Sequence, residues 1–208
     1  MHIIDYKNWK KRKVAIFSAD NSVRSNVKGV LELLEVPAII FCPDDEDLVE
    51  RWKKHRKEIY GIIISGSRFD VGETLAPIIP MEMINSGLPI LGLCYGHEYL
   101  LSILGVNMIE CMPPIGEHGS SIIEIDSTNP IFKGLPIARC IVHMNHHWMA
   151  DPNGMPSDIQ VIAHSKITPV VGFYHPKKKW WGLQFHPERD YMHNIIFKNF
   201  IDACYERL

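Results

Sequence analysis

Short apolar runs alternate with longer amphipathic segments through the first half of the chain. Each run is a few residues long and lies between polar or turn-forming residues, which is typical of strands buried in a parallel sheet. The four runs are residues 14–17, 37–42, 59–65 and 88–93. Helical periodicity follows three of them, in a helix starting near residue 20 and in segments 43–58 and 97–104. This alternation predicts an α/β fold with a doubly wound, mostly parallel open sheet and flanking helices, whose ligands bind at the carboxyl ends of the strands.

After Gly105 the pattern changes to short strands separated by polar turns, some of which we expect to pair antiparallel. A helix with a mostly apolar face is predicted near the C-terminus, from Met192 to Cys204. We find no internal repeat, low-complexity segment or linker, so residues 1–208 are predicted to form a single domain. The predicted short strands are residues 106–111, 121–126, 140–143, 159–164, 170–174 and 180–185.

Composition narrows the choice of function and compartment. The formal net charge of −2 provides no broad basic field, so we expect no nucleic-acid partner. The five cysteines are scattered and form no C-x-x-C pair, which favours a reducing compartment over a disulfide framework. No apolar run approaches the length of a membrane span, and the run after the basic start is too short for a signal peptide. We therefore expect a cytoplasmic protein with no membrane partner.

Cys94 lies between an apolar strand and a helix, with Gly92 two residues before it and Gly96 two residues after it. This G-x-C-x-G spacing copies the G-x-S-x-G nucleophile elbow, in which the abrupt turn requires small residues on both sides. The turn also places the thiol at a helix N-terminus, which favours the thiolate. A buried structural cysteine at a strand end would fit the same stretch. These residues alone leave both interpretations open.

His186 and Glu188 end an apolar run near the C-terminus and are separated by Pro187. Proline restricts its own backbone and keeps the preceding residue out of the helical region, so an extended chain is predicted here. Side chains two apart on an extended chain face the same way, so the carboxylate could orient the imidazole. A surface His-Pro-Glu turn is the alternative interpretation.

The motifs GLCYGHE and QFHPE, in this order, resemble those of the class I (triad) glutamine amidotransferases. Among these, CYG followed by QFHPE is most similar to the glutaminase domain of GMP synthetase, and the resemblance extends from about residue 14 to the C-terminus. It implies a flavodoxin-like fold, no cofactor and a glutamine or other γ-glutamyl substrate. It also implies that Cys94 forms a γ-glutamyl thioester, His186 transfers protons and Glu188 orients the histidine.

The same resemblance implies further site residues. The backbone N–H of Tyr95 and the loop containing Gly66 and Ser67 would form the oxyanion hole. Most of the family has a second glycine in place of Ser67, whereas related γ-glutamyl peptidases resemble this sequence in having Gly-Ser. Gly119 and Ser120 would bind the substrate's α-carboxylate through their backbone.

Glu98 and a histidine-rich segment need separate interpretation. Glu98 replaces a glutamine found in most of the family and lies one helical turn after Cys94, so we expect it to face the substrate. The histidines at 143–147 lack an H-E-x-x-H arrangement, and the family has a comparable segment with no metal, so no metal site is expected.

Three functions fit these features. The first is a stand-alone glutaminase that supplies ammonia to a separate ATP-dependent synthetase subunit, since no phosphate-binding glycine loop and no room for an ATP-pyrophosphatase domain are found in the chain. The second is a γ-glutamyl peptidase that uses the same three residues, which Ser67 and Glu98 leave open. The third is a non-catalytic regulatory module, which has no chemical need for Cys94, His186 and Glu188 together.

Overall fold

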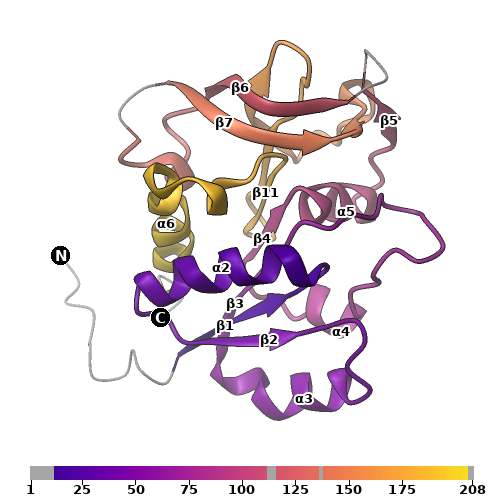
Figure 1. Cartoon of the computed structure of the whole chain (residues 1–208), viewed down its shortest axis with the longest axis vertical. Coiled ribbons are helices and arrows are strands. Elements are labelled where there is room, and N and C mark those ends of the chain that lie inside the picture. Colours follow the sequence, from indigo (N-terminus) through magenta and orange to yellow (C-terminus); the bar gives the residue numbers. More distant parts are fainter. Residues whose placement is uncertain (1–11, 112–115, 136–137, 206–208) are drawn as a thin grey trace.

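The computed structural model describes residues 12–111, 116–135 and 138–205. Within those residues, nine strands form one sheet in the order β2-β1-β3-β4-β11-β10-β9-β6-β7, and β5 and β8 form a separate pair (Figure 1). The strands are β1 (Lys13–Phe17), β2 (Ala38–Phe41), β3 (Ile59–Ile64), β4 (Ile90–Leu93), β5 (Met108–Glu110), β6 (Glu117–Ile125), β7 (Arg139–His146), β8 (Trp148–Ala150), β9 (Gln160–Ser165), β10 (Gly172–His175) and β11 (Trp180–Leu183).

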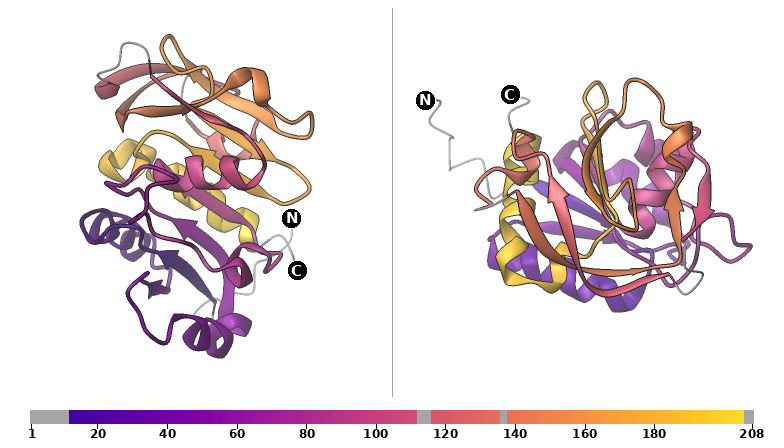
Figure 2. Two further views of the ribbon diagram at one scale, coloured as in Figure 1. Left: turned by 90° about the vertical axis from the view of Figure 1, so that its right-hand side faces the viewer. Right: turned by 90° about the horizontal axis from the view of Figure 1, so that it is seen from above.

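The large sheet has a parallel part and an antiparallel part. Strands β2, β1, β3, β4 and β11 are parallel to their neighbours in that series. Strands β10, β9, β6 and β7 continue the sheet from β11 through antiparallel pairs. The two parts lie at opposite ends of the molecule, as the turned views show (Figure 2). A doubly wound α/β sheet with an antiparallel C-terminal portion is therefore confirmed.

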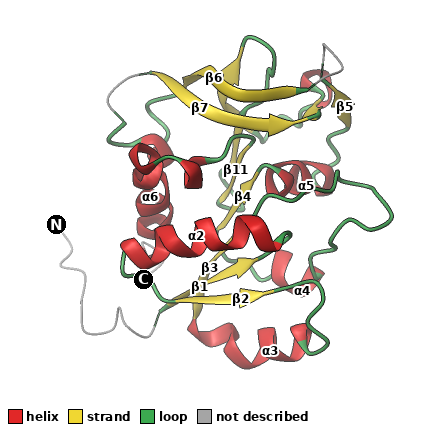
Figure 3. Cartoon of the chain, in the orientation of Figure 1, coloured by secondary structure: helices red, strands yellow, loops and turns green. Residues whose placement is uncertain are grey.

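Helices cover both faces of the parallel part (Figure 3). Apolar residues of α2 (Asn21–Leu33) and α6 (Asn194–Tyr205) pack with alternate residues of β1, β3 and β4 in one buried cluster. The other residues of these strands pack with α3 (Leu48–His55), α4 (Met81–Ile84) and α5 (Tyr95–Ile103) in a second cluster. Strand residues thus alternate between two cores, which explains why the strands read as continuous apolar runs.

β11 brings the C-terminal part of the chain back beside β4. Leu183 is paired with Leu93 in this parallel register, so the two strands end together at the carboxyl edge of the sheet. The residues after β11 therefore lie beside the residues after β4, although about 90 positions separate them in the sequence. This return places the two sequence motifs at one edge.

Several predicted boundaries were wrong in the antiparallel part. β6 begins at Glu117 rather than 121, β7 continues to His146, and β8 was not predicted. Residues 117–121 and 143–146 alternate between buried and solvent-facing positions, and their glycine, serines and histidines resemble a turn in sequence. Such strands depend on their cross-strand neighbours more than on intrinsic propensity. Among the described residues, no helix is long and apolar enough to cross a membrane.

Candidate active site

Cys94 occupies a strained turn between β4 and α5. Its backbone has φ of 49° and ψ of −104°, a conformation that residues with a side chain rarely adopt. A Cβ atom at Gly92 would collide with the backbone of Gly96, and one at Gly96 would lie 2.5 Å from the carbonyl oxygen of Ile64. The sharp turn and its need for small flanking residues are therefore confirmed.

His186 and Glu188 are in contact, but the extended chain predicted between them was wrong. Residues Pro187–Arg189 form a 3-10 helix, with proline at its first turn, and His186 has φ of −108° and ψ of 80°. The Glu188 Oε1 atom lies 2.7 Å from Nδ1 of His186, and both side chains are buried. Because the carboxylate binds the Nδ1 side, the other ring nitrogen, Nε2, is left without a hydrogen-bond partner among the described residues.

Cys94 and His186 both lie against Gly66, the residue that follows Ser65 after β3. A Cβ atom at Gly66 would lie 3.0 Å from Cε1 of His186 and 3.5 Å from Cβ of Cys94. The Cys94 amide donates a hydrogen bond to the Leu183 carbonyl at 2.8 Å, which joins the two strand ends. The fold thus brings Cys94, His186, Glu188 and Gly66 to one place, and a side chain at residue 66 would crowd it.

A cavity of about 210 Å³ opens beside Cys94. Tyr95, Glu98 and Ser67, expected from sequence, line it. Gly119 and Ser120 are not among the described residues that line it, because they lie in β6 opposite Met144 and His143. The lining residues that sequence reasoning missed are Arg68, Phe69, Asp70, Asn145, His146 and His147.

Two of the missed residues could have been identified from the sequence. Arg68 and Asp70 follow directly after the predicted Ser65–Ser67 loop, at the sheet edge where ligands were expected. Asp70 also lines a larger neighbouring cavity of about 550 Å³, where its Oδ2 accepts a hydrogen bond from Nε1 of Trp148 at 3.0 Å. Residues 145–147 come from the end of β7 and the turn after it, whose position depends on antiparallel pairing and has no local signal.

The buried setting of Cys94 disfavours the thiolate that the helix N-terminus is expected to favour. Burial raises the thiol pKa well above its usual value, and the negative charges of Glu98 and Glu188 raise it further. A hydrogen bond from the Tyr95 backbone acts in the opposite direction but is outweighed. The thiol instead donates to the carbonyl oxygen of Asn145, at 3.7 Å.

Glu98 lies on the Cys94 side of α5, as its spacing suggests, but it is buried rather than solvated. Burial raises its pKa to about 8, with Asp70 raising it and a hydrogen bond from Gln184 lowering it. Nε2 of Gln184 donates to Oε1 of Glu98 at 2.8 Å and lies 4.0 Å from the Cys94 sulfur. At neutral pH Glu98 therefore holds a proton in most molecules.

Ser67 fits its position without backbone strain. It is not among the described residues with a positive φ, so the family's usual glycine is not required there for conformation. Its hydroxyl accepts a hydrogen bond from the Phe69 amide at 3.1 Å and donates to the Ala19 carbonyl at 3.4 Å. The assignment of the oxyanion hole to the backbone N–H groups of Tyr95, Gly66 and Ser67 stays a prediction.

The histidines of residues 143–147 are dispersed among different partners. His146 contacts Glu117, the rings of His147 and His118 lie 4.8 Å apart, and the ring of His143 lies 6.3 Å from that of His186. Over the described ranges, no group of three or more histidine, cysteine or acidic side chains is arranged to hold a metal ion.

Known proteins resemble this chain in both sequence and fold. A GMP synthase [glutamine-hydrolyzing] from Caldanaerobacter subterraneus is 33% identical over 69% of the chain, and one from Thermomicrobium roseum is 37% identical over 69%. The matched segments cover only 28% and 27% of those relatives' own lengths. The chain thus corresponds to under a third of each.

Solved structures share the fold. A putative GMP synthase component from Thermoplasma acidophilum superposes with a TM-score of 0.75 at 24% identity, covering 94% of this chain and 95% of that one. A glutamine amidotransferase from Thermotoga maritima gives a TM-score of 0.69 at 20% identity, covering 95% and 84%.

The family model described as "Glutamine amidotransferase class-I" matches residues 16–203. This match includes β3, the Cys94 turn and the His186–Glu188 pair. The chain therefore belongs to the class I glutamine amidotransferases.

Proposed function

We propose that this protein hydrolyses the side-chain amide of glutamine to glutamate and ammonia, with Cys94 as nucleophile. The observation that carries the proposal is the meeting of Cys94 and the His186–Glu188 pair against Gly66, at the edge of a cavity of about 210 Å³. A space of this size suits a single amino acid better than a polymer. A strained nucleophile beside an oriented base is the arrangement that acyl transfer requires.

The reaction follows from the roles of these groups. Nε2 of His186, which has no hydrogen-bond partner among the described residues, takes the thiol proton as the Cys94 sulfur attacks the amide carbon. Backbone N–H groups of Tyr95 and the Gly66–Ser67 loop stabilise the oxyanion. His186 returns the proton to the departing ammonia, then activates a water that splits the thioester. Glu188 fixes the tautomer through Nδ1 and stabilises the imidazolium.

The lining of the cavity suits the charges of a free amino acid. Asp70 offers a carboxylate to the α-ammonium, the Glu98 carboxyl offers an uncharged acceptor beside it, and Arg68 offers positive charge to the α-carboxylate. In this proposal the backbone of Gly119 and Ser120 contributes only if β6 moves closer to the cavity, because its present place is opposite β7.

The direct test is the release of glutamate and ammonia from glutamine. Cys94→Ser should lower the rate by at least about 100-fold, since a hydroxyl here is a far weaker nucleophile. Cys42→Ser, which alters a cysteine that does not line the Cys94 cavity, serves as the matched control and should retain the wild-type rate. Equal rates in the wild type and Cys94→Ser would overturn the proposal.

The ammonia is proposed to pass to an ATP-dependent synthetase. The curated relatives are glutamine-hydrolysing GMP synthases, and more than two thirds of their length lies outside the matched segment. A separate chain resembling that remainder is the proposed acceptor, and the two should co-purify from the source organism.

A second candidate function is supported by the cavity of about 550 Å³ that shares Asp70 with the site. A γ-glutamyl peptide carries a bulky group on the amide nitrogen, which needs room beyond the space for glutamine. If the protein is a γ-glutamyl hydrolase, glutathione should be cleaved faster than glutamine in the absence of any other protein.

A further inference from the structure

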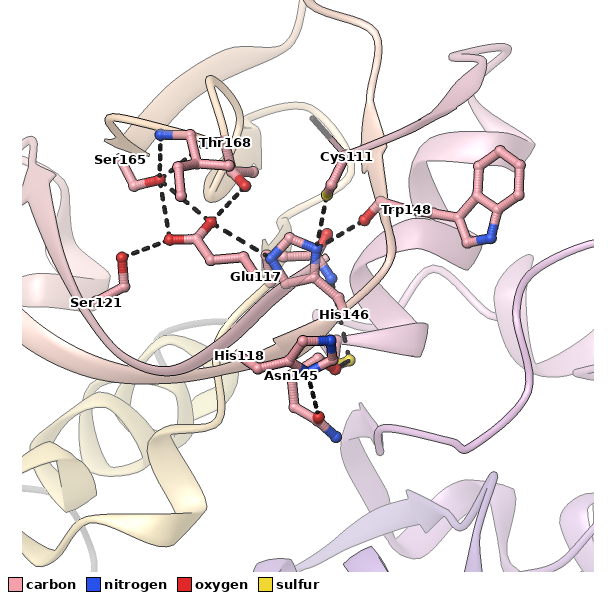
Figure 4. Close-up of polar contacts among 12 residues, drawn as sticks. Cys111, Glu117, His118, Ser121, Asn145, His146, Trp148, Ser165 and Thr168 are labelled. Carbon is pink, nitrogen blue, oxygen red and sulfur yellow. Dashed lines mark hydrogen bonds and ion pairs between the residues drawn. The ribbon is translucent and has the colours of Figure 1, made fainter. Parts of the chain in front are cut away.

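A buried carboxylate lies behind the catalytic cavity and takes no part in the proposed chemistry. Glu117 begins β6 and is paired across the strands with His146, near the end of β7. Its carboxylate accepts hydrogen bonds from Ser121, from Thr168 at 2.6 Å, and from Ser165 at 3.4 Å (Figure 4). Three hydroxyl groups, one from β6 and two from the turn at the end of β9, therefore converge on one buried acid.

The surroundings of Glu117 favour its ionised form, which faces the ring of His146. Burial raises the pKa of Glu117, but the nearby His146 ring and hydrogen bonds from Ser121 and Thr168 outweigh it and bring the pKa to about 2. Nδ1 of His146 lies 2.8 Å from the Trp148 carbonyl oxygen, which can only accept, so Nδ1 carries a proton. Nε2 lies 3.7 Å from Oε2 of Glu117, so the carboxylate faces this nitrogen directly. The His146 ring is thus held between the Trp148 carbonyl and the Glu117 carboxylate.

β7, which ends at His146, also contacts Cys94 and His186, the nucleophile and base of the proposed reaction. The Asn145 carbonyl oxygen accepts the Cys94 thiol at 3.7 Å, and the His143 carbonyl oxygen accepts the backbone N–H of His186 at 3.0 Å. Among the described strands, β7 has β6 alone as a sheet neighbour. The β7 end therefore depends on contacts from β6 for its position.

The residue just before β6 is also closely packed against the end of β7. Gly116, with φ of 77°, precedes Glu117, and a Cβ atom there would collide with the His146 carbonyl. The Cys111 amide donates to the His147 carbonyl at 2.8 Å, on the other side of the same turn. The backbone at 146–147 is thus fixed on several sides, and the Glu117–His146 contact adds a further one.

We propose that Glu117 is a positioning residue of the active site. Through its contact with His146, it holds the end of β7 so that the Asn145 carbonyl orients the Cys94 thiol and the His143 carbonyl fixes the backbone of His186. This proposal rests on the proposed function for its catalytic consequence, but the placement of the thiol can be measured without turnover. A displacement of about 1 Å at a reacting group costs on the order of 100-fold in rate, which makes such a support consequential.

The test compares Glu117→Gln with a matched control on the same strand. Glu124→Gln removes an exposed carboxylate of β6 that lies 3.5 Å from His164 and 3.5 Å from Arg139. Arg139 begins β7, at the opposite end of that strand from His146. The measurement is the rate of Cys94 alkylation by iodoacetamide as a function of pH, resolved by peptide mapping. Glu98, Glu188 and Arg189, the charged groups that influence the thiol, are unchanged in both variants.

Glu117→Gln should shift the alkylation profile of Cys94 to lower pH, because a displaced Asn145 carbonyl no longer stabilises the protonated thiol. The kcat for glutamine should fall about 10-fold or more. Glu124→Gln should change neither. Identical alkylation profiles in wild type and Glu117→Gln would overturn the proposal, whether or not glutamine is hydrolysed. Absence of glutaminase activity with a shifted profile would instead reject the proposed function alone.

A milder variant covers the case in which Glu117→Gln does not fold, which rapid alkylation of buried Cys111, Cys140 and Cys204 would reveal. Thr168→Val keeps the side-chain shape and removes one donor from the Glu117 carboxylate. It should shift the Cys94 profile in the same direction by a smaller amount. An unchanged profile in a folded Thr168→Val protein would then count against the proposal.

Discussion

At the scale of single residues, Cys94 combines a strained backbone with a buried thiol whose pKa is raised. Replacing it with glycine should relieve the positive φ of 49°, whereas alanine keeps the strain. We therefore expect Cys94→Gly to be more stable than Cys94→Ala by about 1 kcal/mol, after the extra chain entropy of glycine is subtracted. Urea denaturation of the two variants gives this difference.

A matched pair at Cys204 serves as the control for this prediction. Cys204 lies within α6, where glycine is less favourable than alanine by about 1 kcal/mol. The order of the two variants should therefore reverse between positions 94 and 204. Alanine being the more stable choice at both positions would mean that the Cys94 turn is not strained in solution.

Glu98 gives the stability of the protein a distinct pH dependence. Its folded pKa of about 8 is raised by burial, so the unfolded chain loses the proton at lower pH than the folded protein does. Stability contributed by the protonated carboxyl is present in acid and is lost as the pH rises through about 8. The unfolding free energy of Glu98→Gln should therefore increase relative to that of the wild type as the pH rises from about 5 to about 8. Thermal denaturation at both pH values tests this, and a constant difference would show that Glu98 titrates normally.

At the scale of elements, the β4–α5 turn tolerates no side chain at its glycines. Gly96→Ala places a Cβ atom 2.5 Å from the Ile64 carbonyl, a backbone atom of β3 that cannot move freely. We expect a loss of about 1–3 kcal/mol in unfolding free energy and a loss of glutamine hydrolysis. Gly29→Ala in α2, where a Cβ meets nothing within 4 Å, should instead stabilise the protein by about 0.5–1 kcal/mol. Equal effects of the two substitutions in chemical denaturation would contradict this account of the turn.

The sequence predicts an element best where the pattern that identifies it lies entirely within that element's own residues. The glycine spacing around Cys94 predicts a sharp turn among neighbouring residues. The apolar runs of β1, β3 and β4 predict strands whose two faces are both buried. The His186–Glu188 contact was anticipated, yet through the wrong backbone, because a proline permits both an extended chain and the first turn of a 3-10 helix.

At the scale of the whole molecule, the antiparallel part encloses the site, and little of this was predictable. The Glu117 network joins β6, β7 and residues 165–168 through register and side-chain reach, which no local pattern encodes. The raised pKa of Cys94 depends on burial under Asn145 as well as on the helix N-terminus that the sequence reveals. Local dipoles can be read from sequence, whereas desolvation needs the assembled fold.

The resting site as a whole predicts weak activity in isolation. The Cys94 thiol donates to a backbone carbonyl, its pKa is raised, and Nε2 of His186 has no hydrogen-bond partner among the described residues. Proton transfer from sulfur to histidine competes with the hydrogen bond from the thiol to Asn145, and we expect contact with a synthetase chain and its nucleotide substrate to release that bond. We expect kcat for glutamine to rise at least about 10-fold when both are added, and the rise to be absent with the synthetase alone or the nucleotide alone. Steady-state ammonia release in the four combinations measures this. Rapid cleavage of glutathione by the isolated protein, unaffected by either addition, would show that the site is complete without a partner and would favour the γ-glutamyl hydrolase.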